Sequence, residues 1–223
     1  MLKANHLIGL GVGGAEKTVE YLGTDTAGGS GATFTFAGAP FGDASGARMI
    51  LVGICGRHED GGEHIDSATI GGVSATILVD VSDLGASVGS SASLFIANVP
   101  TGTSGTIVAT FDTTVTNDEA VIGIWRLEGF NSYTPFDTGS NTSDDLDMTI
   151  NIPAGGAAFA CGLGTTGSTL SISGLSEDFS DGTFTADSAA IGGHSSDMLA
   201  ETNRAISITG GGIDAAGVCV SFD

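Results

Sequence analysis

The sequence has few cations: six lysine and arginine residues occur among 223, against 26 aspartate and glutamate residues, and the formal net charge is −20. Nucleic-acid phosphates and anionic membrane surfaces are bound by clustered lysine and arginine side chains. We therefore expect neither nucleic acid nor a membrane among the partners. A strongly acidic, lysine-poor exterior also keeps a protein soluble.

Long apolar runs and cysteine frameworks are missing as well. No run approaches the ~20 apolar residues of a membrane span. The N-terminal apolar piece is diluted by glycine and lacks an A-x-A cleavage site, so we expect no secretory signal. Cys55, Cys161 and Cys219 are odd in number and lie in apolar or small-residue segments. This favours three buried free thiols, although one disulfide with a spare thiol stays open.

A helical apolar stripe is absent too, and the chain instead shows ten to twelve short segments of alternating apolar and polar residues, separated by glycine-rich turns. With 37 glycines and 41% apolar residues, this pattern is typical of an all-β sandwich or barrel. We predict an all-β fold, a two-sheet β-sandwich of jelly-roll-like architecture. Residues 31–223 are predicted to form one domain, because no linker-like segment divides them, and residues 1–30 a short N-terminal arm.

The residues from Arg48 to Asp80 organise this prediction. Residues 49–55 are apolar or glycine throughout, which suits a strand covered on both faces. Ala68 and Ile70 precede Gly71-Gly72, and alternating apolar residues follow at positions 73–79. Two glycines supply the positive φ angles of a two-residue hairpin turn. We therefore expect a core strand followed by an edge hairpin.

Trp125 is the only tryptophan in the chain. It lies in the apolar segment 121–127, so we expect it to anchor the core. A buried indole N–H needs a hydrogen-bond acceptor. The sequence does not say which residue supplies it.

Two sets of apolar side chains are candidates for contacts with a partner protein. Residues 1–30 differ in composition from the rest and end in G-G-S-G, so they form either an arm that docks on a neighbouring subunit or a first strand. The arm candidates are Leu7, Ile8, Leu10 and Val12. The second set belongs to the segment G-F-N-S-Y-T-P-F and comprises Phe130, Tyr133 and Phe136, which either are exposed at a loop end or pack at the edge of the sandwich.

The loop after the central strand gathers imidazoles and carboxylates. A hairpin could bring His58 and His64 together, with Asp60 or Glu63 completing a site for a divalent ion. The spacing matches no structural zinc motif, and a solvated acidic loop explains the same residues. We expect no cofactor, and the metal site is the lesser of the two interpretations.

Other polar segments favour ordinary turns over chemistry. Residues 141–147 and 177–182 are rich in carboxylates, the ligands that calcium prefers, but neither matches the EF-hand pattern. No G-x-S-x-G occurs, and His194-Ser195 lacks the expected context of a catalytic pair. The glycines at 9–14 lack the helix that phosphate binding requires. We expect no enzyme.

The order of several segments resembles a recurrent family of β-rich structural proteins of tailed bacteriophages and prophages. The residues that carry the resemblance are T-F-T-F-A-G-A-P-F-G-D-A (33–44), A-R-M-I-L-V-G-I (47–54), S-A-T-I-G-G-V-S-A-T-I-L-V (67–79), L-F-I-A-N-V-P-T-G-T-S-G-T-I-V-A-T-F (94–111), I-G-I-W-R-L-E-G-F (122–130) and I-N-I-P-A-G-G (150–156). The match runs from residue 33 to about residue 163. No comparable match follows, so the C-terminal strands depart from the family.

The resemblance implies a virion structural protein, with other virion proteins of the capsid or tail as partners. The expected role is an accessory head component, a capsid decoration or spike protein, that forms a homo-oligomer by protein–protein contacts. Its expected location is the virion, assembled in the host cytoplasm and exposed to the medium. Two alternatives remain: a tail-tip or fibre-associated protein that attaches to the host, and a secreted carbohydrate-binding module.

Overall fold

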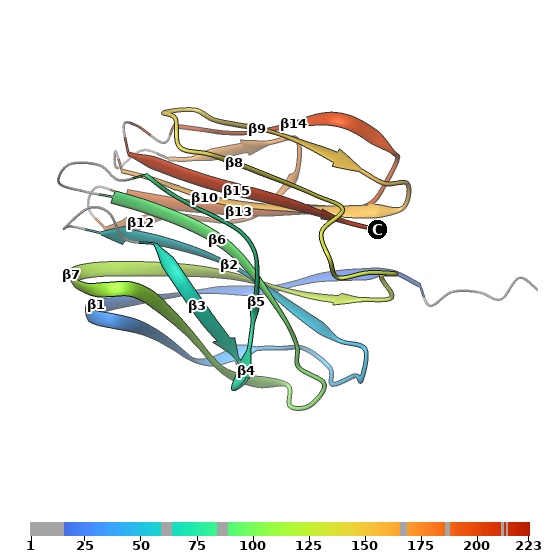
Figure 1. Ribbon diagram of the computed structural model, residues 1–223, viewed down its shortest axis with the longest axis horizontal. Helices are drawn as coiled ribbons and strands as arrows, with labels where there is room; N and C mark the ends of the chain where they lie inside the picture. Colours follow the sequence, from blue (N-terminus) through green and yellow to red (C-terminus); the bar gives the residue numbers. More distant parts are fainter. Residues whose placement is uncertain are drawn as a thin grey trace, which may run out of the picture.

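All the secondary structure of the described residues is β-strand, which confirms the predicted all-β sandwich (Figure 1). The computed structural model describes residues 16–58, 64–83, 89–165, 169–185, 188–210, 212 and 214–223, without the side chains of residues 113–118 and 182–185. Within these ranges no helix has the length and apolar character of a membrane span. The strands are β1 Thr18–Pro40, β2 Met49–His58, β3 Ile65–Ile70, β4 Val73–Ser74, β5 Thr76–Asp83, β6 Gly89–Asn98, β7 Ser104–Glu128, β8 Asp137–Asn141, β9 Leu146–Ile152, β10 Gly156–Gly164, β11 Ser171–Ser173, β12 Ser176–Thr185, β13 Ser188–Met198, β14 Glu201–Thr209 and β15 Ala215–Phe222.

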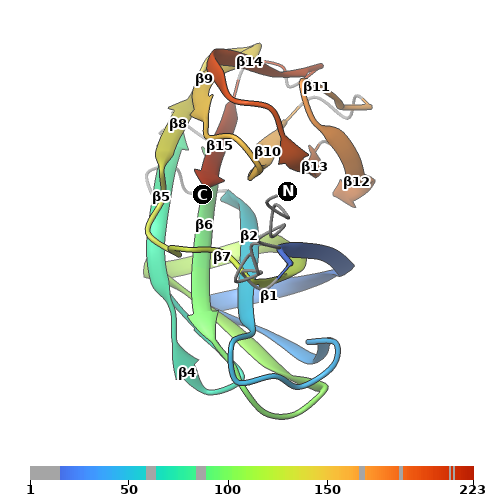
Figure 2. The same ribbon diagram turned by 90° about the vertical axis from the view of Figure 1, so that its right-hand side faces the viewer.

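These strands form three antiparallel sheets, where the sequence predicted two. The first has the order β4-β3-β7-β2-β6-β5, with β1 paired to β7; the second has the order β12-β13-β10-β15-β8, and the third β11-β14-β9. The first sheet therefore uses only the N-terminal half of the chain, and the other two use only the C-terminal half. Figures 1 and 2 show the C-terminal half stacked on the N-terminal half. This strand order does not establish a jelly roll.

The first sheet folds over itself because β1 and β7 bend together. Residues 18–29 of β1 pair with residues 118–128 of β7, whereas residues 33–40 pair with residues 104–110. The bend falls at the G-G-S-G segment, where Gly29 and Gly31 adopt positive φ angles that a side chain would disfavour. The predicted arm boundary at residue 30 thus falls inside a strand: residues 18–30 belong to the sandwich, and residues 1–15 lie outside the described residues.

Three apolar clusters fill the spaces between the layers of strands. The first fills the fold of the first sheet, the second joins the two halves of the chain, and the third lies between the second and third sheets. Strand β2 is buried on both faces, since Ile50 and Val52 belong to the first cluster while Leu51 and Cys55 belong to the second. This confirms the prediction of a doubly covered central strand.

Further local predictions are also confirmed. Gly71 and Gly72 have φ angles of 59° and 79°, and Ile70 pairs with Val73 across this turn. The three cysteines are buried free thiols. Trp125 is fully buried in the cluster between the halves. Turns and core positions therefore follow from local sequence patterns, independently of the long-range strand pairing.

Candidate interaction surface

Of the residues of the predicted metal site, His58 ends β2 and His64 directly precedes β3. His58 is buried, its Nε2 is 2.9 Å from Ser91 Oγ, and its ring meets the Phe111 ring edge-on at 5.0 Å. His64 Nδ1 lies 3.1 Å from Asp112 Oδ2. Asp60 and Glu63 fall outside the described residues. Among the residues that the structure describes, no three His, Cys, Asp or Glu side chains gather as a metal site would require, and the hypothesis stays a prediction.

His194 takes part in a partly buried polar cluster, but not with Ser195. Its Nδ1 lies 2.6 Å from Asp178 Oδ2, and the same carboxylate oxygen accepts a hydrogen bond from Trp125 Nε1 at 2.7 Å. Ser195 Oγ instead accepts a hydrogen bond from the Ser176 N–H, because neighbouring side chains of a strand point to opposite faces. Asp178 thus ties β7 of one half to β12 and β13 of the other, and it is the Trp125 partner that the sequence left open.

Tyr21 lies beside this cluster, stacked on Phe179 at 6.3 Å. Burial, and then the nearby Asp178 carboxylate, raise the pKa of Tyr21 from 10.0 to about 12. A raised folded-state pKa contributes stability that is complete below pH 10 and is lost as pH rises towards about 12. In a Tyr133→Phe variant, which leaves Tyr21 as the only tyrosine, we expect ultraviolet absorbance to show phenolate only near pH 12. A midpoint near pH 10, as for a free phenol, would contradict this placement.

The connection between the halves, residues 129–136, carries the three aromatic residues predicted to contact a partner. Phe130 is buried and packs against Phe222 with a centroid distance of 6.2 Å. Tyr133 is half-buried, and its hydroxyl donates to the Ala47 carbonyl at 3.3 Å. Phe136 is 55% exposed. Phe130 and Tyr133 therefore pack at the edge of the sandwich, whereas Phe136 is exposed at the surface.

Each of these aromatic residues lines a different hollow. Phe130 lines a cavity of about 320 Å³, Tyr133 a groove of about 540 Å³, and Phe136 a hollow of about 480 Å³ that also includes Ala200. Leu199, the neighbour of Ala200, is 82% exposed. Residues of the connection therefore line all three hollows.

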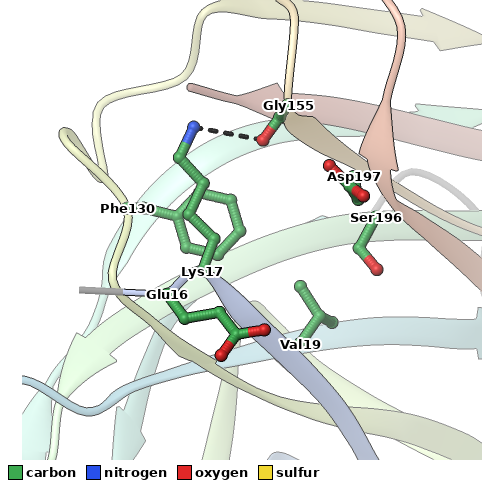
Figure 3. Close-up of a pocket in the computed structure, with 7 residues that line it drawn as sticks. All are labelled: Glu16, Lys17, Val19, Phe130, Gly155, Ser196 and Asp197. Atoms are coloured by element: carbon green, nitrogen blue, oxygen red, sulfur yellow. Dashed lines mark hydrogen bonds between the residues drawn. The ribbon is translucent and has the colours of Figure 1, made fainter. Parts of the chain in front are cut away.

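The described chain enters the fold at the first of these cavities (Figure 3). Lys17 Nζ donates to the Gly155 carbonyl at 3.1 Å, lies 3.4 Å from an Asp223 carboxylate oxygen, and sits 5.8 Å from the centre of the Phe130 ring. These contacts fix the point from which the preceding residues leave. The predicted arm residues Leu7, Ile8, Leu10 and Val12 themselves lie outside the described residues.

The groove beside Tyr133 continues along a sheet edge. Strand β5 pairs with β6 on one side, and no strand of the described ranges pairs with its other side. Ile77 is 38% exposed, and Leu78 and Val79 are partly exposed. Met49, Ile96 and Pro135 complete the apolar lining of the groove. An unpaired edge with apolar side chains is a template for pairing with another strand.

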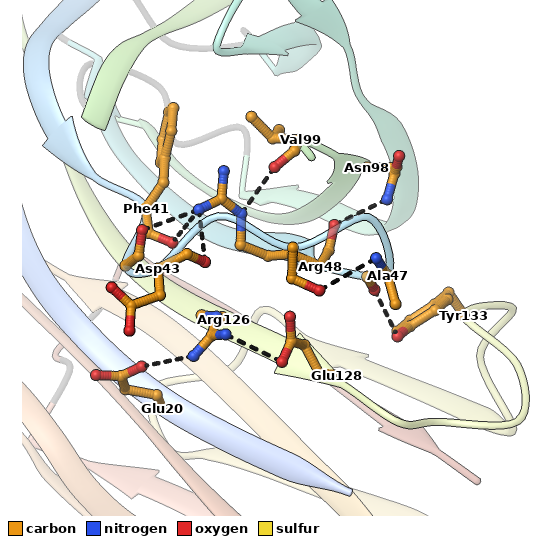
Figure 4. A network of polar contacts seen from close by, with 12 residues as sticks. Glu20, Phe41, Asp43, Ala47, Arg48, Asn98, Val99, Arg126, Glu128 and Tyr133 are labelled. Carbon is orange, nitrogen blue, oxygen red and sulfur yellow. Dashed lines mark hydrogen bonds and ion pairs between the residues drawn. The ribbon is translucent and has the colours of Figure 1, made fainter. Parts of the chain in front are cut away.

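A buried arginine holds the loops around this surface (Figure 4). Arg48 is fully buried, and its five N–H groups donate to six backbone carbonyls, those of Phe41, Gly42, Asp43, Val99, Thr101 and Gly102. The two N–H groups of Nη1 are shared among the first three of these carbonyls. It therefore ties the loop before β2 to the turn after β6. Sequence reasoning missed this role, and the available signal was an arginine directly before a wholly apolar strand.

Comparison with known proteins gives no family. No family model matches the chain, and no curated protein matches it. Among solved structures, a conserved protein of unknown function from Pseudomonas aeruginosa PAO1 is 12% identical, covering 92% of this chain and 89% of that one, with a TM-score of 0.27. A chain in the crystal structure of Cucumber Necrosis Virus is 12% identical, covering 93% of this chain and 96% of that one, with a TM-score of 0.25. The mavirus major capsid protein is 9% identical, covering 99% of this chain and 85% of that one, with a TM-score of 0.21. Likenesses this weak carry no argument about function.

Proposed function

We propose that the chain is a structural component of a tailed-bacteriophage particle and acts through protein–protein contacts without catalysis. The observation that carries this proposal is the unpaired β5 edge, whose exposed apolar side chains adjoin a groove lined by the connection between the halves. A solitary soluble protein protects such an edge, whereas an assembly protein pairs it with a neighbour. The family resemblance of residues 33–163 supports the same role.

The charges of the described residues fit a protein whose contacts are selective. Lys17, Arg126 and Arg204 form ion pairs with carboxylates, and Arg48 is buried among carbonyls. Unpaired carboxylates therefore dominate the exterior and oppose unspecific association. We infer an accessory head component that presents this acidic exterior to the medium and binds other virion proteins through the apolar edge.

Locating the protein in particles tests the proposal. Particles purified from a lysate of the phage that encodes this chain are expected to contain it in many copies, and gold-labelled antibodies are expected to decorate the heads. A major tail protein labelled in parallel serves as the positional control. Recovery of the chain only in the soluble fraction, with none in the particles, would contradict a virion role.

Attachment to the host at the tail tip is the second candidate, favoured by one observation. Phe136 is 55% exposed and lines the third hollow, and Leu199, which precedes the lining residue Ala200 in the chain, is 82% exposed. Label at the tail tip, with loss of host adsorption in a Phe136→Ser variant, would favour this candidate. The aromatic platform of a carbohydrate-binding module finds less support, because Phe130 and Tyr133 pack against neighbouring residues.

A further inference from the structure

We propose that the N-terminal segment of one copy, centred on Leu7–Val12, adds as an antiparallel strand to the free edge of β5 in a neighbouring copy. The inference deepens the proposed function and rests on it. It names a second copy of this chain as the partner and the β5 edge as the surface.

The edge needs a strand with one apolar face. The groove along β5 is apolar through Ile77, Leu78 and Ile96. In the segment L-I-G-L-G-V, the alternate residues Ile8, Leu10 and Val12 would share one face of a strand, with glycines between them. Such a strand brings backbone donors and acceptors to the open edge and apolar side chains to the groove.

Chain length places the donor in another copy. The register of the first sheet runs Tyr21, Trp125, Leu51, Ile96, Thr76, so β1 and β5 lie four strand spacings apart. At about 4.8 Å for each spacing, a strand added beyond β5 lies about 24 Å from β1. The four residues from Glu16 back to Val12 span at most about 14 Å. A strand that places Val12 beside β5 therefore cannot come from the same chain.

Charge gives the direction of the added strand. Residues 1–15 contain Lys3 and His6 and no acidic residue, unlike the rest of the chain. Strand β5 carries Asp80 and Asp83 towards its C-terminal end. Burial raises the pKa of Asp83 and so disfavours its charged form, and Asp214 lies close enough to raise this pKa further, so acidic side chains gather at this end. Antiparallel addition brings Lys3 and His6 to that end, whereas parallel addition would take them away from it.

Cross-linking between copies tests the inference. Two full-length variants, Leu10→Cys and Ile77→Cys, are mixed and treated with a short bis-maleimide. The native thiols are buried, so the new cysteines are the accessible ones. We expect a product of twice the chain mass. Leu10→Cys mixed with Ser173→Cys, on the exposed strand β11 of the third sheet, is the matched control and is expected to give none. No product, or equal yields in the two mixtures, would overturn the inference.

Sedimentation provides a second measurement. Ile77→Lys places a charge on the β5 edge and is expected to weaken self-association at least about tenfold. Leu199→Lys replaces an apolar side chain elsewhere that is more exposed than Ile77, and it is expected to leave association unchanged. Equal behaviour of the two variants, at equal melting temperatures, would refute docking at β5. A chain found on phage heads without the cross-link would refute the docking site and leave the proposed function standing.

Discussion

Replacing Arg48 by alanine is expected to cost about 2–5 kcal/mol of unfolding free energy, because at least two of its carbonyl partners are buried and would lose their donor. The Val99 carbonyl accepts from Arg48 Nε at 2.7 Å and the Phe41 carbonyl accepts from a guanidinium nitrogen at 3.1 Å, both away from solvent. Four more carbonyls are partly buried, so water can replace some of the donation to them. Urea unfolding followed by tryptophan fluorescence measures the loss.

The matched variant for this experiment is Arg48→Lys. Lysine keeps the charge but has three rotatable donors in place of a planar fork with five. We therefore expect its stability to fall between those of the wild type and the alanine variant. The self-association of Arg48→Ala is also expected to weaken, since the arginine holds the loop whose Ala47 carbonyl accepts from Tyr133 beside the groove. Wild-type stability in the alanine variant would show that the buried carbonyls find donors elsewhere.

Adding one methyl group at Gly123 or at Gly192 is expected to cost about 1–3 kcal/mol each, as overpacking of a filled core does. A Cβ at either position would overlap the ring of Phe179, which lies between β7 and β13. The backbone has little freedom there, because Gly123 pairs with Gly53 of β2 and Gly192 with Cys161 of β10. Thermal unfolding of Gly123→Ala and Gly192→Ala measures the effect.

A double variant separates overpacking from a loss of backbone freedom. Combining Gly123→Ala with Phe179→Leu shortens the side chain that the new methyl meets. The loss of unfolding free energy in the double variant is therefore expected to be smaller than the sum of the losses in the two single variants. Gly46→Ala is the matched control, since no atom lies near its Cβ position and its φ is not positive; its stability is expected to change by less than about 0.5 kcal/mol. If the losses of unfolding free energy in the two single variants simply add in the double variant, the cost arises from the backbone and not from contact with Phe179.

Much of the fold could be predicted from short sequence patterns. The apolar run at 49–55 predicted a doubly covered strand, and Gly71-Gly72 predicted the hairpin turn; the structure confirms both. The pattern could not show that the segments 106–111 and 121–127 belong to one strand, Ser104–Glu128. The polar residues between them resemble a loop, but they pair with the bend of β1. Pairing with a distant strand supplied what local propensity did not.

The candidate interaction surface could be predicted from the sequence only in part. The three aromatic residues of the connection were singled out from sequence, but their different burial was decided by contacts with Phe222 and Ala47, which lie far away in the chain. Nothing in the local sequence marked Asp178 as the acceptor for Trp125, 53 residues earlier. Likewise, the free edge of β5 is a property of the strand order, because an edge is defined by the neighbour that a strand lacks.

The sequence by itself determined the element type, the acidic exterior and the core positions, since alternation, turn chemistry and charge are properties of neighbouring residues. Only the tertiary structure decided that β1 and β7 fold the first sheet over itself, that three cores separate the layers, and that β5 is left at an edge. The physical reason is that an alternating strand can bury its apolar face against many partners. Which partner it takes depends on how all the strands together bury the most apolar surface.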